Sequence, residues 1–290
     1  MTGPSSPTDQ PTVWLCYNSA SGSHVDGLEE QIAERLAAAD LNIARSFDAQ
    51  SDELPDAGMA SGAKVDVIIV HGGDGTLNGL VSRLIGWDGT ILPLPGGTAN
   101  LLCHELFEEC EWDAILDHYA AGKLTPRNLK VLRCSEHIAL AEMLVGPAAL
   151  WADAREEIRN KEASAVIATA TDAAVQSAEG PFVQIIEPEI GREEGYPGVR
   201  FILDYGAMKI EGYWQDGFLD FIKQGLAILT HDFRQGPHDD LGTAKWVVCR
   251  ARDDAEIELM VDGERATISS TAEISYETLG IKVLASKARD

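Results

Sequence analysis

The chain has 290 residues, 45% of them hydrophobic, which is enough to bury two domain-sized cores. Its net charge of −24 argues against a nucleic-acid partner and against strong electrostatic docking on anionic lipids. No stretch reaches the roughly 18 consecutive apolar residues that a membrane-spanning helix needs, and the polar start is not typical of a secretion signal. The five widely spread cysteines are expected to be reduced thiols. We therefore expect a cytoplasmic protein without a transmembrane segment.

The first part of the chain alternates between strand and helix patterns. Residues 1–11 are polar and rich in Pro and Ser, and a disordered tail is expected there. Apolar runs at residues 13–17, 65–70 and 91–94 predict buried strands. Helical spacing of apolar residues follows the first two runs, at Leu28, Ile32 and Leu36 and again at Leu77, Leu80, Val81 and Leu84. The order strand, loop, helix predicts an α/β domain with a mainly parallel sheet over residues 12–125.

The pattern changes after about residue 125. Short apolar runs separated by turn signals predict a β-rich domain over residues 126–264, and residues 265–290 are expected to return to the first domain. One helical pattern, at residues 147–160, lies among these strands, whereas an earlier one around Trp112 and Tyr119 is interpreted as core packing. The runs that predict strands are residues 129–132, 182–186, 199–203, 245–249 and 257–261.

A glycine-rich loop, Gly72-Gly73-Asp74-Gly75-Thr76, lies where a predicted strand ends and a helix begins. Glycines let the backbone approach phosphate oxygens, and the amides of the following helix N-terminus attract anions. A carboxylate at this place would repel phosphate unless a cation such as Mg²⁺ lay between them, so Asp74 suggests a nucleotide with its metal. The alternative is a tight turn with Asp74 as a helix N-cap.

Two further loops rich in small and polar residues follow other predicted strands, at residues 18–23 and 96–100. Loops that follow parallel strands gather at one edge of the sheet, so the three loops are expected to converge there and to hold a polyphosphate. The chain contains neither GxGxxG nor GxxxxGK[ST], so a dinucleotide Rossmann site and a Walker-type loop are not supported. The seven histidines show no metal-type spacing and are interpreted as surface or core residues, with His71 beside the phosphate loop.

The order of four motifs resembles the diacylglycerol kinase catalytic-domain family, which includes bacterial lipid kinases and sphingosine kinases and is distantly similar to NAD kinases and phosphofructokinases. These motifs are the loop at residues 18–22, the glycine-aspartate loop at 72–76, Pro-Gly-Gly-Thr-Ala-Asn at 95–100, and Val-Asp-Gly-Glu at 261–264. The resemblance implies an α/β nucleotide-binding domain of the NAD kinase/phosphofructokinase type, a C-terminal β-sandwich domain, and ATP with Mg²⁺.

The resemblance also implies roles for individual residues. Asp74 would lie near the metal and the reacting phosphoryl group, and Asp262 and Glu264 would activate the acceptor hydroxyl. Taken alone, Asp262-Gly263 favours a hairpin turn between two strands. The residues implied in binding the nucleotide are Asn18, Ser21, Gly72, Gly73, Gly75, Thr76, Thr98 and Asn100.

The chain departs from the family pattern at two places. Leu101 stands where many members have an aspartate. The glycine-rich segment expected early in the second domain is altered at residues 144–154, and the acids at 216–220 resemble a family motif but equally suit a turn that enters a strand. These departures affect the assignment of the acceptor-binding residues more than that of the ATP-binding residues.

Three functions are weighed on this basis. The first is an ATP-dependent lipid kinase that phosphorylates a hydroxyl of a diacylglycerol-like or sphingoid lipid, with transient contact to a membrane and a location in the cytoplasm or peripheral at the membrane. The second is a kinase of a soluble alcohol or nucleotide, as in NAD kinases, and the third is a catalytically inactive nucleotide-binding regulatory protein. A homodimer is compatible with a strand edge in the β-rich domain.

Overall fold

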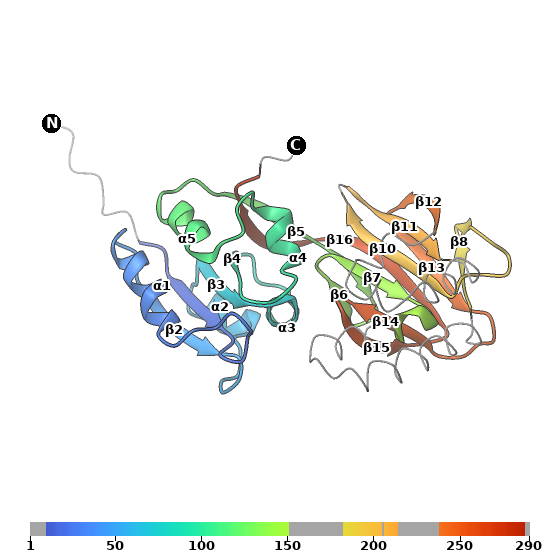
Figure 1. Cartoon of the computed structure of the whole chain (residues 1–290), viewed down its shortest axis with the longest axis horizontal. Helices are drawn as coiled ribbons and strands as arrows, with labels where there is room; N and C mark the ends of the chain where they lie inside the picture. The colour runs from blue at the N-terminus through green and yellow to red at the C-terminus, as the bar shows by residue number, and fades with distance from the viewer. Residues whose placement is uncertain (1–9, 151–181, 205, 214–237, 288–290) are drawn as a thin grey trace. The chain divides into compact units, whose positions relative to one another are not determined.

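The computed structural model of the chain describes residues 10–150, 182–204, 206–213 and 238–287. It divides into two compact units (Figure 1). The first unit comprises residues 1–129 together with 278–290, and the second comprises residues 130–277. Each unit has its own core of buried hydrophobic side chains.

The first unit is built on a parallel sheet with the strand order β2-β1-β3-β4-β16. β3 pairs in parallel with β1 on one side and with β4 on the other, which places it at the centre. The end of β16 pairs in parallel with β4 through Lys282 and Val283. The strands are β1 (Val13–Tyr17), β2 (Ile43–Asp48), β3 (Val67–Gly72), β4 (Thr90–Pro95) and β16 (Thr271–Ala285).

Five helices are described in the first unit, and their apolar faces are buried. α1 buries Leu28, Ile32 and Leu36, the three residues whose spacing predicted it. α5 buries Ile115 and Leu116, in agreement with its interpretation as core packing. The helices are α1 (Leu28–Ala37), α2 (Ala57–Gly62), α3 (Asp74–Arg83), α4 (Leu101–Leu106) and α5 (Trp112–Ala120).

The second unit contains a six-stranded antiparallel sheet with the order β12-β11-β10-β7-β14-β15, and a second sheet in which β13 pairs with β16 and β8. Through β16 this second sheet is continuous with the strands of the first unit, as one 10-stranded sheet. β5 and β6 form a hairpin that belongs to this second sheet. The strands are β5 (Thr125–Cys134), β6 (His137–Ala139), β7 (Glu142–Val145), β8 (Val183–Glu187), β9 (Glu189–Ile190), β10 (Gly198–Asp204), β11 (Ala207–Tyr213), β12 (His238–Ala244), β13 (Trp246–Ala251), β14 (Ile257–Val261) and β15 (Glu264–Ile268).

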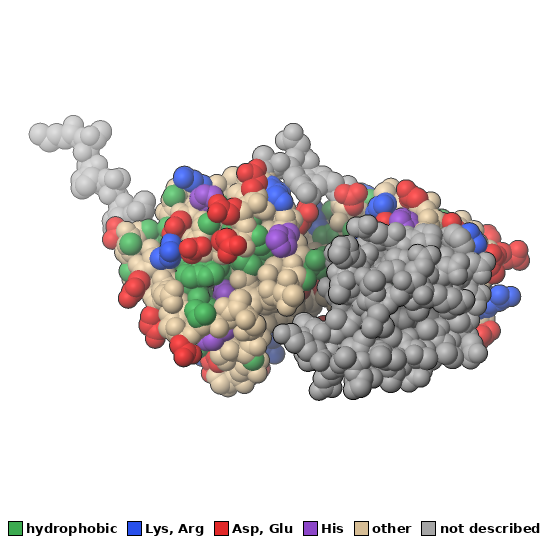
Figure 2. Space-filling view, in the orientation of Figure 1, with side chains coloured by type: hydrophobic (Ala, Val, Ile, Leu, Met, Phe, Trp, Pro, Cys, Tyr) green, Lys and Arg blue, Asp and Glu red, His purple; other side chains and the backbone are tan. Residues whose placement is uncertain are grey.

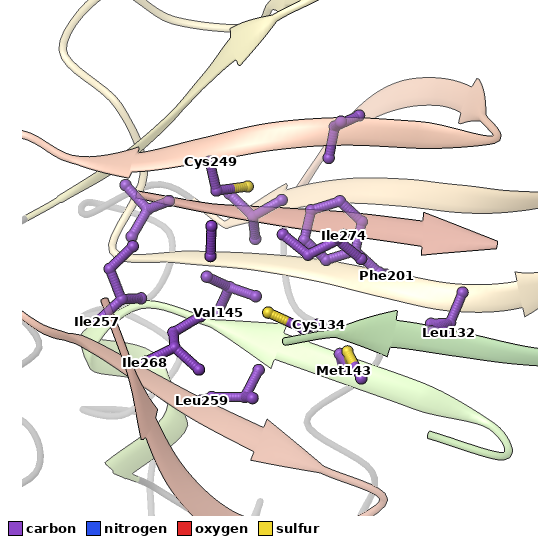
Figure 3. Close-up of a cluster of buried hydrophobic side chains, with 14 of the residues drawn as sticks. Leu132, Cys134, Met143, Val145, Phe201, Cys249, Ile257, Leu259, Ile268 and Ile274 are labelled. Carbon is purple, nitrogen blue, oxygen red and sulfur yellow. The ribbon is translucent and has the colours of Figure 1, made fainter. Parts of the chain in front are cut away.

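The core of the second unit lies between these two sheets (Figure 3). Met143, Val145 and Phe201 enter it from the six-stranded sheet, and Cys249 and Ile274 enter it from the other. This arrangement of two sheets around one core is a β-sandwich. A mainly parallel α/β unit followed by an antiparallel β-sandwich confirms the predicted fold class. All five cysteines are free.

The opposite face of the six-stranded sheet carries a buried ionic network. Arg200 alternates with the core residue Phe201 along β10, so the two side chains point to opposite faces. The Arg200 guanidinium contacts Glu142 of β7 and donates to Glu211 of β11 at 3.2 Å, and all three residues are buried. Tyr213 also donates to Glu211, at 3.3 Å. Lys209 also donates to Glu211, at 2.8 Å, so two cations compensate the two buried carboxylates.

Several sequence predictions reach beyond the described residues. The helical pattern at 147–160 begins in a 3₁₀ turn, Pro147–Leu150, and the rest of it lies outside them, as do the acids at 216–220. Among the residues that are described, no helix combines the length and the apolar composition needed to cross a membrane.

Candidate phosphate-binding site

Three loops follow the carboxyl ends of β1, β3 and β4, which are neighbours in the first sheet. The first loop is fastened to the second. The amide of Asn18 donates to the carbonyl of His71 at 3.1 Å, and its side-chain nitrogen donates to the Thr76 hydroxyl at 2.9 Å. Asn18 thereby connects the end of β1 to the first turn of α3.

The second and third loops approach each other so closely that only glycine fits. The Gly96 amide donates to the Gly72 carbonyl at 2.9 Å. A Cβ atom added to Gly97 would lie 2.5 Å from the Cα of Gly73, and one added to Gly96 would lie 2.7 Å from the nitrogen of Gly72. Real Cβ atoms do not approach other heavy atoms this closely, so these glycines allow the two backbones to touch.

The helix after the second loop presents its N-terminus at this edge of the sheet. α3 begins at Asp74, and its N-cap is Gly73, in extended conformation and without a side chain to cap the helix. The first amides of any α-helix have no intrahelical acceptor and carry partial positive charge. The turn therefore offers amides of Gly75 and Thr76 to an anion, as expected from the sequence.

Asp74 points its carboxylate toward the start of α4. Its Oδ1 accepts the Leu101 amide at 2.7 Å. Burial raises the pKa of Asp74, while hydrogen bonds from backbone amides at residues 100–102 act in the opposite direction. Asp74 is thus a half-buried acid that joins two loops of the site, and it is not a simple N-cap of its own helix.

The third loop is held in shape by Asn100. Its side chain accepts from the Gly97 amide and donates to the Gly97 carbonyl, each at 2.8 Å, and its backbone is left-handed with φ 47°. Thr98 lies between Gly97 and Asn100 in the sequence, and its side chain is exposed. In the described structure, Asn100 therefore shapes the loop that presents Thr98.

Ser21 and His71 differ from the other residues of these loops. The Ser21 hydroxyl and both ring nitrogens of His71 are buried and have no hydrogen-bond partner among the described residues. His71 is completely buried, and this burial lowers its pKa to about 4. The sequence placed His71 beside the phosphate loop but gave no sign that its nitrogens would lack partners.

Asp48 was not identified from the sequence, although it orients the first loop. Its carboxylate accepts from the Ser19 hydroxyl at 2.7 Å and from the Ser19 amide at 3.2 Å. Asp48 is the last residue of β2, which pairs in parallel with β1. Asp48 could have been found from its position at the carboxyl end of a parallel strand next to β1, but only if β2 had first been recognised in the sequence.

Asp262 and Glu264 lie in the second unit, at the hairpin between β14 and β15. Val261 pairs with Glu264, and Asp262 and Gly263 between them have φ values of 50° and 101°, typical of a type I′ turn. The Asp262 carboxylate accepts three backbone amides, from Leu140 at 2.7 Å and from the next two residues at 2.9 and 3.0 Å. Glu264 is exposed.

The structure therefore brings the predicted nucleotide-binding residues together at one edge of the first sheet. Acidic side chains are spread over the visible face of this unit (Figure 2). Within the described ranges, no three His, Cys, Asp or Glu side chains gather as a metal site.

Known structures share this fold. The crystal structure of a diacylglycerol kinase from Bacillus anthracis str. Sterne is 19% identical, with a TM-score of 0.62, and the match covers 96% of this chain and 98% of that one. A second structure from the same organism, provisionally named a diacylglycerol kinase, is 20% identical with a TM-score of 0.60 and the same coverage. At such identities the likeness establishes the fold.

Sequence comparison finds a family model that matches part of the chain. A search of curated proteins finds no significant match. The sequence of residues 12–132, however, matches the model of the diacylglycerol kinase catalytic domain, and this range contains all three loops. This part of the chain is therefore similar in sequence to the diacylglycerol kinase catalytic domain.

Proposed function

We propose that this protein transfers the γ-phosphoryl group of ATP to a hydroxyl of a diacylglycerol-like or sphingoid lipid. The observation that carries the proposal is the backbone contact between Gly97 and Gly73, which joins two glycine loops beside the N-terminus of α3. A site made of backbone amides at a helix N-terminus suits a polyphosphate. The sequence similarity of residues 12–132 to the diacylglycerol kinase catalytic domain supports a lipid as acceptor.

The proposed nucleotide site uses the loops after β1, β3 and β4. Amides of Gly73, Gly75 and Thr76 would bind phosphate oxygens, because they lie at the start of α3. Asn18 would hold the Thr76 hydroxyl in place through its hydrogen bond of 2.9 Å, and Thr98 would add an exposed hydroxyl from the third loop. These groups position the nucleotide and stabilise charge on the transferred group.

Mg²⁺ fits this site as a companion of the nucleotide. Proteins usually bind Mg²⁺ through one or two carboxylates together with substrate phosphates. Asp74 supplies one carboxylate at the glycine loop, and the described residues contain no cluster of three acids, histidines or cysteines. Asp74 would hold the ion jointly with the phosphates, whose charge the ion partly neutralises when bound.

Asp262 and Glu264 remain the proposed acids for activation of the acceptor, and the geometry suggests different tasks for them. Asp262 uses both carboxylate oxygens to bind three amides, so it would position the hairpin. Glu264 is exposed beside the turn, so its carboxylate would accept the proton that the attacking hydroxyl loses.

The lipid substrate implies transient contact with a membrane or micelle. A net charge of −24 disfavours anionic surfaces, so the proposed contact is apolar and reversible. The test is ATP consumption with Mg²⁺ while diacylglycerol, monoacylglycerol, ceramide and sphingosine are presented separately in neutral mixed micelles. Wild type is compared with Asp74→Asn, which keeps an acceptor oxygen for the Leu101 amide, and with Glu264→Gln.

Lipid-dependent turnover that falls by roughly a hundredfold or more in both variants is the expected result. Turnover only with water-soluble alcohols or nucleotides would replace the lipid acceptor by a soluble one. ATP binding without turnover of any of the lipids or of the water-soluble acceptors would contradict catalysis and favour a regulatory nucleotide-binding protein.

A further inference from the structure

Ser21, His24 and His71 form a cluster of buried polar groups, here called the histidine cluster. The Ser21 hydroxyl, Nδ1 of His24 and both nitrogens of His71 are buried without a hydrogen-bond partner within the described part of the chain. Buried polar atoms are nearly always paired, because an unpaired one costs roughly 1–3 kcal/mol. Four such atoms on two adjoining segments, the first loop and the end of β3, point to a ligand that supplies the missing partners.

The backbone brings these side chains together at the edge of the sheet. His71 pairs with Tyr17 across β3 and β1, and the His24 ring stacks on Tyr17 with 6.0 Å between ring centroids. Ser23, between Ser21 and His24, donates a hydrogen bond to the Gly96 carbonyl. The His71 Cε1 atom lies 2.9 Å from the place that a Cβ on Gly96 would occupy. The first loop is thus connected to the end of β1 beside His71 and, through Ser23, to the third loop at Gly96.

The charges around the cluster favour an anion. The pKa of His71 is lowered to about 4, first by burial and then by the positive charge of His24. A negative group beside His71 would oppose both effects.

The acidic groups near the cluster act on other residues. Asp48 interacts with His24, and burial, together with Glu29, Asp48 and Asp52, raises the pKa of Tyr17. Asp74 is three residues beyond His71, with its Oδ1 on the Leu101 amide. No acid is among the groups that shift the pKa of His71.

We propose that Ser21, His24 and His71 form a phosphate subsite in which the two imidazoles and the hydroxyl donate hydrogen bonds to one phosphate group of the nucleotide. The assignment rests on the proposed function for the identity of the nucleotide. The existence of an anion subsite at the first loop, whatever the anion, rests only on the buried polar atoms that lack partners. His24 and His71 thereby become binding residues in addition to those of the glycine loops.

The test is calorimetric titration of the full chain with MgATP and, separately, with inorganic tripolyphosphate. His71→Leu removes both unpaired nitrogens at similar volume, and His24→Phe keeps a ring on Tyr17. His104→Gln, at an exposed histidine of α4, is the matched control. We expect a loss of affinity of roughly tenfold or more in His71→Leu, a smaller loss in His24→Phe, and none in the control.

A second readout separates a binding role from a structural one. Without ligand, His71→Leu should have a thermal midpoint equal to or above that of wild type, because it removes buried atoms that lack partners. A lower midpoint together with unchanged affinity would show that His71 is structural and would overturn the proposal. Should His71→Leu not fold, His24→Phe and Ser21→Ala decide by the same affinities.

The two ligands distinguish this proposal from the proposed function. If wild type binds neither MgATP nor tripolyphosphate, both fail. If it binds only tripolyphosphate and His71→Leu weakens that binding, the anion subsite stands while the kinase proposal fails. If both ligands bind wild type and the variants equally well, the histidine cluster holds at most a buried water and the proposal is overturned.

Discussion

The loops of the first unit and the six-stranded sheet of the second both bury polar side chains, but they satisfy them differently. In the second unit, Arg200 contacts two buried glutamates, and the Asp262 carboxylate accepts three amides. In the first unit, His71 is just as deeply buried, yet both its nitrogens lack partners among the described residues. Paired polar groups stabilise a fold, whereas unpaired ones are kept where a ligand binds.

The largest effect is expected from breaking the ionic network. Arg200→Met should lower the free energy of unfolding by about 3–5 kcal/mol, because it removes the buried guanidinium from Glu142 and Glu211, of which Glu211 keeps Lys209 at 2.8 Å. Urea denaturation measures the loss. The matched control adds Glu142→Gln and Glu211→Gln to Arg200→Met and should recover much of the stability. A loss below about 1 kcal/mol would mean that the network is solvated.

The next effect is the pH dependence that His71 creates. Its pKa of about 4 in the folded protein is below the value of about 6.5 of a free histidine, so the unfolded chain binds more protons between these values. Stability should therefore fall as the pH is lowered through this window, by up to about 3 kcal/mol from His71.

Urea denaturation of wild type and His71→Leu at about pH 7 and about pH 5 measures this dependence. The variant should gain stability relative to wild type as the pH falls. If the free energy of unfolding differed between the two proteins by the same amount at both pH values, His71 would have an ordinary pKa. That result would argue against its burial without hydrogen-bond partners.

A smaller loss is expected at the hairpin of the second unit. Asp262→Asn tolerates the left-handed backbone but replaces one carboxylate oxygen by a donor that faces amides, so unfolding should become easier by about 2 kcal/mol. Thermal or urea unfolding measures it. Glu264→Gln, at the exposed neighbour, should change stability by less than about 0.5 kcal/mol, and an equal loss in both would contradict the division of tasks between them.

The smallest effect in free energy is expected at the contact of the glycine loops. Gly97→Ala places a Cβ against the Cα of Gly73 and should weaken MgATP binding by roughly tenfold, or about 1.4 kcal/mol. Gly79→Ala in α3 meets nothing within 4 Å, so it is the matched control and should leave the affinity unchanged. Unchanged affinity in Gly97→Ala would show that the close approach does not shape the site.

The sequence predicted those elements whose side chains are buried throughout. β3 is buried along its whole length, and its apolar run at residues 65–70 indicated it to within two residues. β2 was not predicted from the sequence, because most of its side chains are partly or fully exposed. Its sequence therefore shows neither an apolar run nor a clear alternation. With β2 unrecognised, the role of Asp48 at its end could not be predicted either.

The site was predictable where loops follow strands and unpredictable where distant residues meet. The convergence of three loops follows from the parallel order of their strands. The partners of Asp262 lie more than 100 residues away in sequence, and no local pattern specifies them. The unpaired nitrogens of His71 likewise depend on which residues cover it, so only the fold reveals them.

The central claim is that the loops after β1, β3 and β4 bind the phosphates of MgATP, and amide hydrogen exchange measured by mass spectrometry tests it most directly. On addition of MgATP, peptides that cover residues 18–24, 72–80 and 96–101 should exchange more slowly, because their amides and loops become bound. Peptides from the core strands β10 and β14 should not change. Unchanged exchange in all three loops at a saturating nucleotide concentration, or protection confined to the second unit, would contradict the account.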